Sequence, residues 1–153
     1  MLTLRYDGTA YHGWQVQPNA PTVQQTLQDA VERVTGARSG LIGCSRTDAG
    51  VHADMFCCTL DTDSPLRDNK LCSALNFYLP SDIAVYRAAA VAADFHPRYQ
   101  AKGKRYCYRI WNGAQRHPFY DRYAIHRNRP LDETELNRAA ADYVGSHDFA
   151  AFC

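Results

Sequence analysis

The stretch that decides the fold is GCSRTDAGVHA, residues 43–53. It is a short polar turn between two apolar runs, and it therefore predicts two neighbouring strands, 41–44 and 51–60, joined at one end of a sheet. The turn holds Asp48 at a strand end, where a rigid sheet commonly presents functional side chains. Turn chemistry alone also explains an Asp followed by Ala-Gly, because such a carboxylate often bonds nearby backbone N–H groups.

The hydrophobic pattern on either side predicts the remaining elements. Residues 2–6 alternate as a strand does, and residues 22–36 have a Thr cap, apolar residues at helical spacing and a Gly stop. A second helix starts with Ser-Pro and ends at a Pro over residues 64–80, and residues 83–91 form a fourth strand. The order β-α-β-β-α-β predicts an α+β fold for residues 1–97, a ferredoxin-like domain with two helices on one face of a mainly antiparallel sheet.

The composition changes after residue 97, and we expect a domain boundary there. Residues 98–111 are predicted as a long strand or hairpin arm, and 122–126 as another strand. An Asp cap and a Gly stop delimit a helix over 132–145. These elements are too few to close a sheet, so residues 98–153 are interpreted as the start of a second, incomplete α/β domain whose apolar faces stay exposed or need a partner.

A basic segment holds most of the positive charge. The net charge is +1, yet residues 98–129 contain nine Lys or Arg and one Asp, interleaved with tyrosines and other aromatic residues. Cations that contact phosphates and aromatic faces that stack on unpaired bases are typical of RNA binding. A solvated, charged pair of strands explains the same pattern equally well.

The sequence also indicates in which cellular compartment the protein is located. No apolar run approaches the roughly 20 residues of a membrane span, and residues 1–6 have neither the basic start nor the apolar core of a secretory signal. The six cysteines form no Cys-x-x-Cys pair and no dense framework. We therefore expect a cytoplasmic protein with no membrane association.

Five short motifs follow one another along the chain. They are YDGTAYHGWQ at 6–15, RTDAGVHA at 46–53, DFHPRY at 94–99, KRYCY at 104–108 and GSHDF at 145–149. In this order they resemble the motifs of the TruA family of tRNA pseudouridine synthases. Ser45 departs from the Gly that is commonest there, and members of that family are longer than this chain.

The resemblance implies an isomerase that converts uridine to pseudouridine in the anticodon stem-loop of tRNA, at tRNA positions 38, 39 and 40, without a cofactor or a metal. It implies that Asp48 is catalytic and that Arg46 and Tyr106 bind the substrate, Tyr106 by packing on the target base. It also implies tRNA as the partner, a homodimer for the full-length protein, and a second α/β domain related to the first, as in the pseudouridine synthase fold. Whether this shorter chain is active by itself is left open.

An ionised carboxylate suits this chemistry. The base–ribose C–N bond must be broken, the base rotated while it stays bound, and a new bond made through carbon. Asp48 would either add covalently to the sugar or base, or remove a ribose proton to give a transient glycal. Arg46 would either hold the carboxylate or enter the RNA stack, because a guanidinium both pairs with oxyanions and stacks; we favour the RNA role.

Two other functions fit parts of the pattern. A βαββαβ sheet with aromatic strands and a basic segment also describes a non-catalytic RRM-like RNA-binding module. Asp48, His52 and Asp54 could be metal ligands of a metal-dependent hydrolase, although His52 is expected rather as a structural hydrogen-bonding residue.

The first motif predicts a loop beside the same turn. Asp7, Gly8 and Gly13 are expected to shape that loop, and Gln15 and Gln17 to face RNA. A purely structural loop explains these residues nearly as well.

Overall fold

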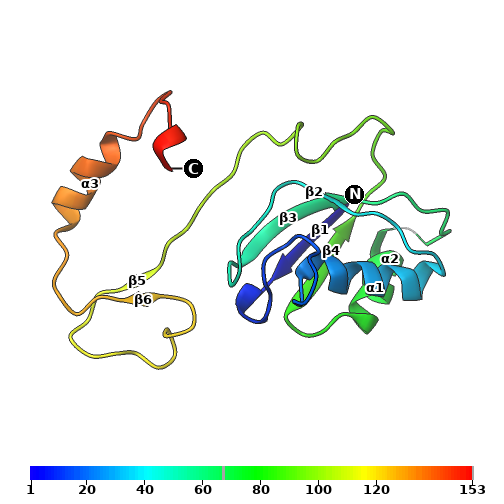
Figure 1. Ribbon diagram of the computed structural model, residues 1–153, viewed down its shortest axis with the longest axis horizontal. Helices are drawn as coiled ribbons and strands as arrows, with labels where there is room; N and C mark the ends of the chain where they lie inside the picture. The colour runs from blue at the N-terminus through cyan, green and yellow to red at the C-terminus, as the bar shows by residue number, and fades with distance from the viewer. Residues whose placement is uncertain (67, 153) are drawn as a thin grey trace. The chain divides into compact units, whose positions relative to one another are not determined.

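The structure is a computed structural model that describes residues 1–66 and 68–152. Residue contacts divide the chain into two compact units, Met1–Lys104 and Arg105–Cys153 (Figure 1). The domain boundary expected at residue 97 stays a prediction. Among the described helices, none combines the length and the apolar character that a membrane crossing requires.

The first unit contains a four-stranded antiparallel sheet and two helices. Its main elements are, in chain order, β1 (Leu2–Tyr6), α1 (Val23–Thr35), β2 (Ile42–Gly43), β3 (Ala53–Thr59), α2 (Asp68–Tyr78) and β4 (Ile83–Ala88). The strands lie in the order β2-β3-β1-β4, and every neighbouring pair is antiparallel. This is the ferredoxin-like arrangement, so the predicted fold class is confirmed.

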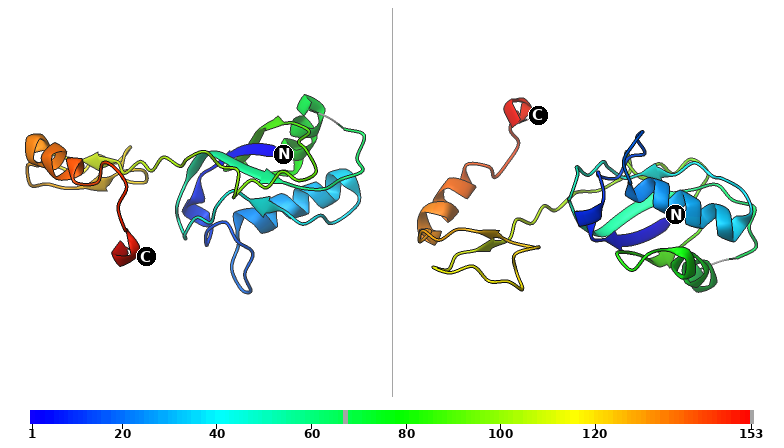
Figure 2. Two further views of the ribbon diagram at one scale, coloured as in Figure 1. Left: turned by 90° about the horizontal axis from the view of Figure 1, so that it is seen from above. Right: turned by 60° about the horizontal axis from the view of Figure 1, so that its bottom comes forward.

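One hydrophobic core joins the sheet to both helices. Leu2 and Leu4 of β1 point to the same face of the sheet, as alternate residues of a strand do, and both are buried. Leu27 of α1 and Leu75 of α2 are buried in the same cluster. Both helices therefore pack on one face of the sheet, and Figure 2 gives two further views of this unit.

The first helix begins and ends where local chemistry predicts. The Thr22 hydroxyl oxygen accepts a hydrogen bond from the Gln25 N–H, which satisfies one of the free donors at the helix start. Gly36 ends the helix in the left-handed region, at a φ of 77°. The helix predicted between these two caps is confirmed.

The second helix begins later than predicted. It starts at Asp68, whereas the sequence suggested Ser64-Pro65; Arg67, within the predicted helix, lies outside the described residues. The Ser64 hydroxyl oxygen accepts from the Leu66 N–H, and the Thr62 hydroxyl oxygen accepts from the Ser64 N–H. Such local side-chain bonds compete with helix formation, which explains the later start.

Three strands of this unit are shorter than predicted. β2 covers Ile42–Gly43 instead of residues 41–44, β3 covers Ala53–Thr59 instead of residues 51–60, and β4 ends at Ala88 instead of residue 91. The last ladder-like bond beyond β4 runs from the Ala89 N–H to the carbonyl oxygen of Met1. A strand extends only as far as a neighbouring strand pairs with it, and sequence alternation does not encode that pairing.

The second unit has two short parallel strands and a helix. These elements are β5 (Ile110–Trp111), β6 (Ile125–His126), α3 (Glu133–Ala141) and the 3-10 turn η2 (Ala150–Phe152). Asp132 caps α3 as predicted, with its carboxylate accepting from the N–H groups of Thr134 and Glu135. The helix ends at Ala141, before the predicted stop at residue 145.

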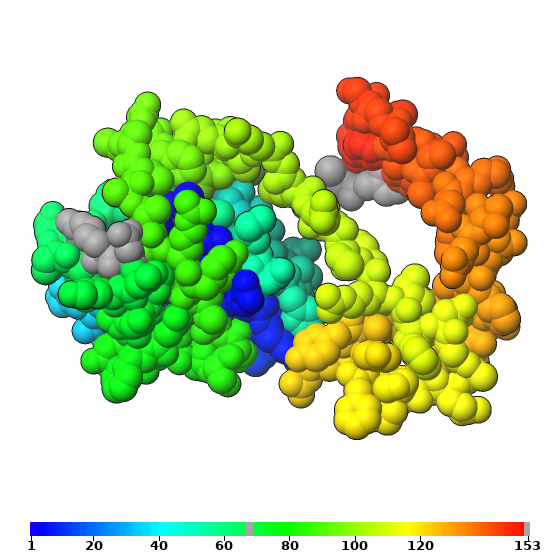
Figure 3. Space-filling model, turned by 180° about the vertical axis from the view of Figure 1, so that it is seen from behind, coloured from blue at the N-terminus to red at the C-terminus, as the bar shows by residue number. Residues whose placement is uncertain are grey.

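The long strand predicted over residues 98–111 is wrong except for its last two residues. A strand requires a neighbour that pairs with its N–H and C=O groups, and within the described chain only Ile110 and Trp111 find one, in β6. The side chains of residues 105–109 are exposed (Figure 3). The pairing is also parallel, so it is not a hairpin, and the strand predicted over 122–126 is limited to β6.

Candidate active site

Two loops meet at one end of the sheet. The N-terminal loop, residues 7–21, follows β1 and contains the short 3-10 turn η1 (Gly8–Ala10); the Asp48 loop, residues 44–52, joins β2 to β3. The Trp14 N–H donates to the carbonyl oxygen of Thr47 at 3.1 Å, and the Gly50 N–H donates to the carbonyl oxygen of Tyr11 at 3.1 Å. The backbones of the two loops therefore bind each other on both sides of Asp48.

Two glycines allow this close contact. A Cβ atom on Gly13 would lie 2.3 Å from the Thr47 carbonyl oxygen, and one on Gly8 would lie 2.0 Å from the Val51 carbonyl oxygen. Gly13 also has a φ of +83°, a conformation that residues with a side chain rarely adopt. The expectation that Gly8 and Gly13 shape the loop beside the site is confirmed.

Aromatic side chains support the Asp48 loop from the core. Tyr6, Trp14 and Phe56 are buried, and the ring centroids of Trp14 and Phe56 lie 4.2 Å apart. The Tyr6 hydroxyl lies 2.9 Å from the Thr47 hydroxyl, close enough for a hydrogen bond in which either group can donate. Burial raises the pKa of Tyr6 to about 12, so its phenol stays protonated at neutral pH.

His52 ties the far end of the Asp48 loop to the N-terminal loop. Its Nδ1 atom lies 3.1 Å from the Gly8 nitrogen and 3.0 Å from Asp7 Oδ1. A neutral Nδ1 accepts from the Gly8 N–H, whereas a protonated Nδ1 donates to Asp7, so either form holds the loops together. The structural hydrogen-bonding role expected for His52 is confirmed.

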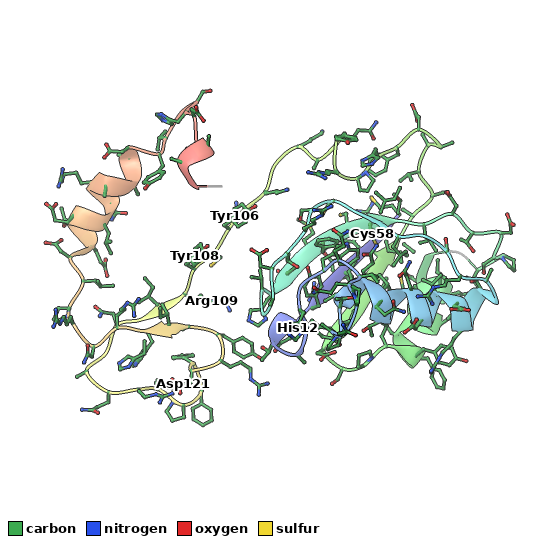
Figure 4. The ribbon with its side chains drawn as sticks, viewed as in Figure 1. His12, Cys58, Tyr106, Tyr108, Arg109 and Asp121 are labelled. Atoms are coloured by element: carbon green, nitrogen blue, oxygen red, sulfur yellow. The ribbon has the colours of Figure 1, made fainter. Side chains whose placement is uncertain are left out.

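Asp48 lines an open pocket of about 450 Å³. The residues around it come from both loops and are His12, Gln15, Gln17, Arg46, Thr47, Asp48 and Ala49. His12 is labelled on the N-terminal loop in Figure 4. The predicted residues Asp48, Arg46, Gln15 and Gln17 are thus brought to one pocket by the fold.

The Asp48 carboxylate is exposed. Among the described residues, no hydrogen bond or ion pair reaches the side chain of Asp48 or that of Arg46, and the two are not paired with each other. Of the two roles considered for Arg46, holding the carboxylate is therefore not the one seen. The carboxylate is available to a ligand that enters the pocket.

The proposed metal ligands do not form a metal site. Within residues 1–66 and 68–152, no group of three or more His, Cys, Asp or Glu side chains is arranged to hold a metal ion. His52 contacts Gly8 and Asp7, and Asp54 lies 3.5 Å from the Arg5 guanidinium. The geometry gives the hydrolase hypothesis no support.

Comparison with known proteins identifies the family. A family described as tRNA pseudouridine synthase matches residues 3–100, which include both loops of the pocket. The chain belongs to this family. The resemblance inferred from the five motifs is confirmed, and neither the hydrolase nor the RRM-like module is supported.

Several curated tRNA pseudouridine synthases are similar over almost the whole chain. "tRNA pseudouridine synthase A" of Thermoanaerobacter sp. (strain X514) is 47% identical over 152 residues, and that of Ruminiclostridium cellulolyticum is 43% identical over 151. "tRNA pseudouridine synthase A 2" of Bacillus anthracis is 41% identical over 152 residues. Each alignment covers 99% of this chain and 62% of the relative, so the chain spans about three fifths of the length of these synthases.

Tyr106 lies in the second unit, whereas the pocket belongs to the first. Its side chain is 78% exposed and projects from the extended segment before β5 (Figure 4). Each unit has its own internal geometry, so Tyr106 is not assigned to the Asp48 pocket, and its role in a pseudouridine synthase stays a prediction.

Sequence reasoning missed the role of Tyr6 and Thr47, which support the Asp48 loop. Both belong to the quoted motifs, and Tyr6 also ends an alternating strand, but neither is singled out there as a site residue. Position could have drawn attention to them, because Tyr6 ends β1 where the N-terminal loop begins and Thr47 immediately precedes Asp48.

Proposed function

We propose that the protein isomerises uridine to pseudouridine in tRNA, with Asp48 as the catalytic residue. The observation that supports this most directly is an unpartnered carboxylate in an open pocket, on a loop held rigidly by a second loop. A carboxylate that is already bonded to the protein would have to break that bond before attacking a sugar or base. Asp48 has no such bond to lose.

The proposed isomerisation requires one reacting carboxylate, which Asp48 supplies. Breaking the base–ribose bond and remaking it through carbon involves no net oxidation, so one carboxylate is sufficient, and we propose neither a cofactor nor a metal. Asp48 acts either as a nucleophile towards the nucleoside or as a base that removes a ribose proton. Both routes require the carboxylate to be ionised and directed at the bound uridine.

Arg46 is proposed to contact RNA. It is exposed, lines the pocket beside Asp48, and makes no ion pair among the described residues. An unpaired guanidinium can bind a phosphate or stack in the position that a base leaves when it rotates out of the helix. Gln15 and Gln17, which line the same pocket from the N-terminal loop, are proposed to face the same RNA.

Tyr106 is proposed to pack on the extruded uracil. An exposed aromatic face offers about 1–3 kcal/mol of stacking per base and still allows the base to rotate in its plane. The neighbouring basic segment, with nine Lys or Arg in residues 98–129, is proposed to contact tRNA phosphates. The anticodon stem-loop as substrate, a homodimer for the full-length protein and action in the cytoplasm belong to the same proposal.

The function is tested by the release of tritium from tRNA that carries tritium on carbon 5 of uridine. Carbon 5 becomes the glycosidic carbon, so its hydrogen leaves during the reaction. For the intact protein we expect release, and for Asp48→Ala a loss of about 10³-fold or more, because the reacting group is gone.

Asp54→Ala is the matched control. Asp54 is also an exposed carboxylate, six positions further along the chain, and in the part of the chain that the structure describes its one ion pair is with exposed Arg5. We expect less than about a 2-fold change, since exposed ion pairs contribute little. Equal tritium release by the wild type and Asp48→Ala would refute the proposed role, and no release by the wild type would refute the function.

A further inference from the structure

Thr47 is bonded from two directions, immediately before Asp48. Its carbonyl oxygen accepts from the Trp14 N–H at 3.1 Å, and its hydroxyl lies 2.9 Å from the hydroxyl of Tyr6. The Tyr6 ring is 4% exposed, so this second bond is shielded from solvent on the Tyr6 side. Tyr6 belongs to β1, a central strand of the sheet, and the bond therefore links the loop to the rigid part of the fold.

The ring of Tyr6 is itself fixed. Its centroid lies 6.5 Å from that of Trp14 and 5.7 Å from that of Phe56, and the latter two rings pack directly on each other. A Cβ atom on Gly43 would come within 2.7 Å of Trp14 Nε1, so the backbone of β2 lies against the indole. The Tyr6 hydroxyl therefore has little freedom to move away from Thr47.

Asp48 depends on this anchor, because its own side chain has none. Among the described residues nothing bonds to the Asp48 carboxylate, so its direction is set only by the backbone that carries it. That backbone is held on one side by the two bonds to Thr47 and on the other by the Gly50 N–H bond to Tyr11. A misplacement of about 1 Å in a reacting group can reduce a rate by about 100-fold.

We propose that Tyr6 is a positioning residue, whose hydroxyl acts through the side chain of Thr47 to direct the Asp48 carboxylate at the bound uridine. This inference rests on the proposed function of Asp48. Tyr6 does not touch substrate in this account and exchanges no proton with it. Its protonated phenol, with a pKa raised by burial, keeps the bond intact across the neutral pH range.

The test removes each half of the hydrogen bond in the intact protein. Tyr6→Phe and Thr47→Val each delete one hydroxyl with little change of shape, and we expect each to lower the single-turnover rate of tritium release by about 10-fold. The double variant is expected to be no slower than either single variant, because the same bond is already lost. Thr47→Ser retains the hydroxyl and should stay within about 3-fold of wild type.

Two measurements separate positioning from a general loss of stability. Tyr6→Phe should leave the Kd for tRNA unchanged within about 2-fold, and it should lower the rate under conditions where the protein is fully folded. Val31→Ala, which truncates a buried residue of α1 outside both loops, is expected to lower the melting temperature and to keep the wild-type single-turnover rate. Multiplied effects in the double variant, or a rate that follows melting temperature in all variants, would overturn the proposal.

A third measurement does not depend on activity. Amide hydrogen exchange at Trp14 reports its bond to the Thr47 carbonyl oxygen, and we expect exchange about 10-fold faster in Tyr6→Phe and Thr47→Val but not in Thr47→Ser. Unchanged exchange in the first two variants would overturn the role of Tyr6, whatever the activity. Absence of tritium release by the wild-type protein would instead overturn the proposed function, so the two failures are distinguishable.

Discussion

At the scale of single residues, the pocket depends on two glycines, because a side chain at either position would collide with the Asp48 loop. Gly13 and Gly8 let the N-terminal loop approach the Asp48 loop until backbone atoms touch. The Asp48 carboxylate therefore owes its placement to neighbours with no reactive group, and their contribution is measurable as stability.

Gly13→Ala is expected to destabilise the protein by about 3 kcal/mol, because the new methyl group meets the Thr47 carbonyl oxygen and the left-handed conformation is strained. Gly36→Ala is the matched control, with a φ of +77° and nothing within 4 Å of the added carbon, and should cost only about 1 kcal/mol. Urea denaturation of both variants measures the difference. Equal losses would mean that the contact with Thr47 is not a constraint.

Residues that line the pocket were easier to predict than the residues that support it. Turn chemistry alone explains Asp48, but the ordered motifs single out Asp48 and Arg46, and the fold brings both to one pocket. Tyr6 has an ordinary explanation in the sequence, since an aromatic residue at an alternating strand position is expected in the core. Its hydroxyl contact with Thr47 joins residues 41 positions apart, which no local pattern contains.

At the scale of elements, a side chain completes the edge of the sheet. β4 is an outer strand, and the Asn76 side chain of α2 donates to the Val85 carbonyl oxygen at 2.7 Å and accepts from the Val85 N–H at 2.8 Å. One amide thus satisfies the two outward groups of Val85 as a neighbouring strand would. This contact also fixes α2 to β4.

Asn76→Ala is expected to reduce the free energy of unfolding by about 2 kcal/mol, because both hydrogen bonds are lost together. Asn76→Asp retains the acceptor and loses the donor, so its loss should be intermediate. Ser73→Ala, an exposed change on the same helix, should alter stability by less than about 0.5 kcal/mol. Thermal or urea unfolding gives the three values, and a loss for Asn76→Ala no larger than that for Ser73→Ala would contradict this account.

Elements that depend on interactions between nearby residues were predicted more accurately than elements that depend on contacts between distant parts of the chain. α1 was predicted at both ends because its caps, Thr22 and Gly36, act within a few residues. The start of α2 was placed too early because Ser64 bonds its own neighbours instead of capping a helix. Residues 98–109 have the composition of a strand but no partner within the described chain, and strand pairing is a long-range property.

At the scale of the whole molecule, two buried tyrosines make stability depend on alkaline pH. Burial raises the pKa of Tyr6 to about 12, and burial together with the carboxylate of Asp82 raises that of Tyr11 above its ordinary value. Above about pH 10 the unfolded chain releases these protons while the folded protein retains them. Folding is therefore opposed increasingly as the pH rises through this range.

We expect the titration of Tyr6 and Tyr11 to leave the free energy of unfolding unchanged between pH 8 and about pH 9.5. Between about pH 10 and 12 it should lower the free energy of unfolding. Urea denaturation at a series of pH values measures the slope, and absorbance of tyrosinate follows the titration. Tyr6→Phe should show a shallower decline than wild type. An identical decline in both proteins would contradict the raised pKa of Tyr6.

The overall fold of the first unit could be predicted because its six elements are consecutive and each has a clear pattern. The order of strands then follows from the fold class, and the antiparallel pairing of β1 with β3 and β4 agrees with it. The second unit could not be predicted as well. Its helix α3 has no buried residue, so the apolar face of this helix has no core to pack against.

The touching backbones of the two loops also limit how such a site can be redesigned or transplanted. If residues 44–52 alone were grafted onto another scaffold, they would lose their close contact with the backbone at Gly8 and Gly13. An insertion in either loop would displace the other. A graft of this site therefore has to include the N-terminal loop and the Asp48 loop together, with the end of β1 that contains Tyr6.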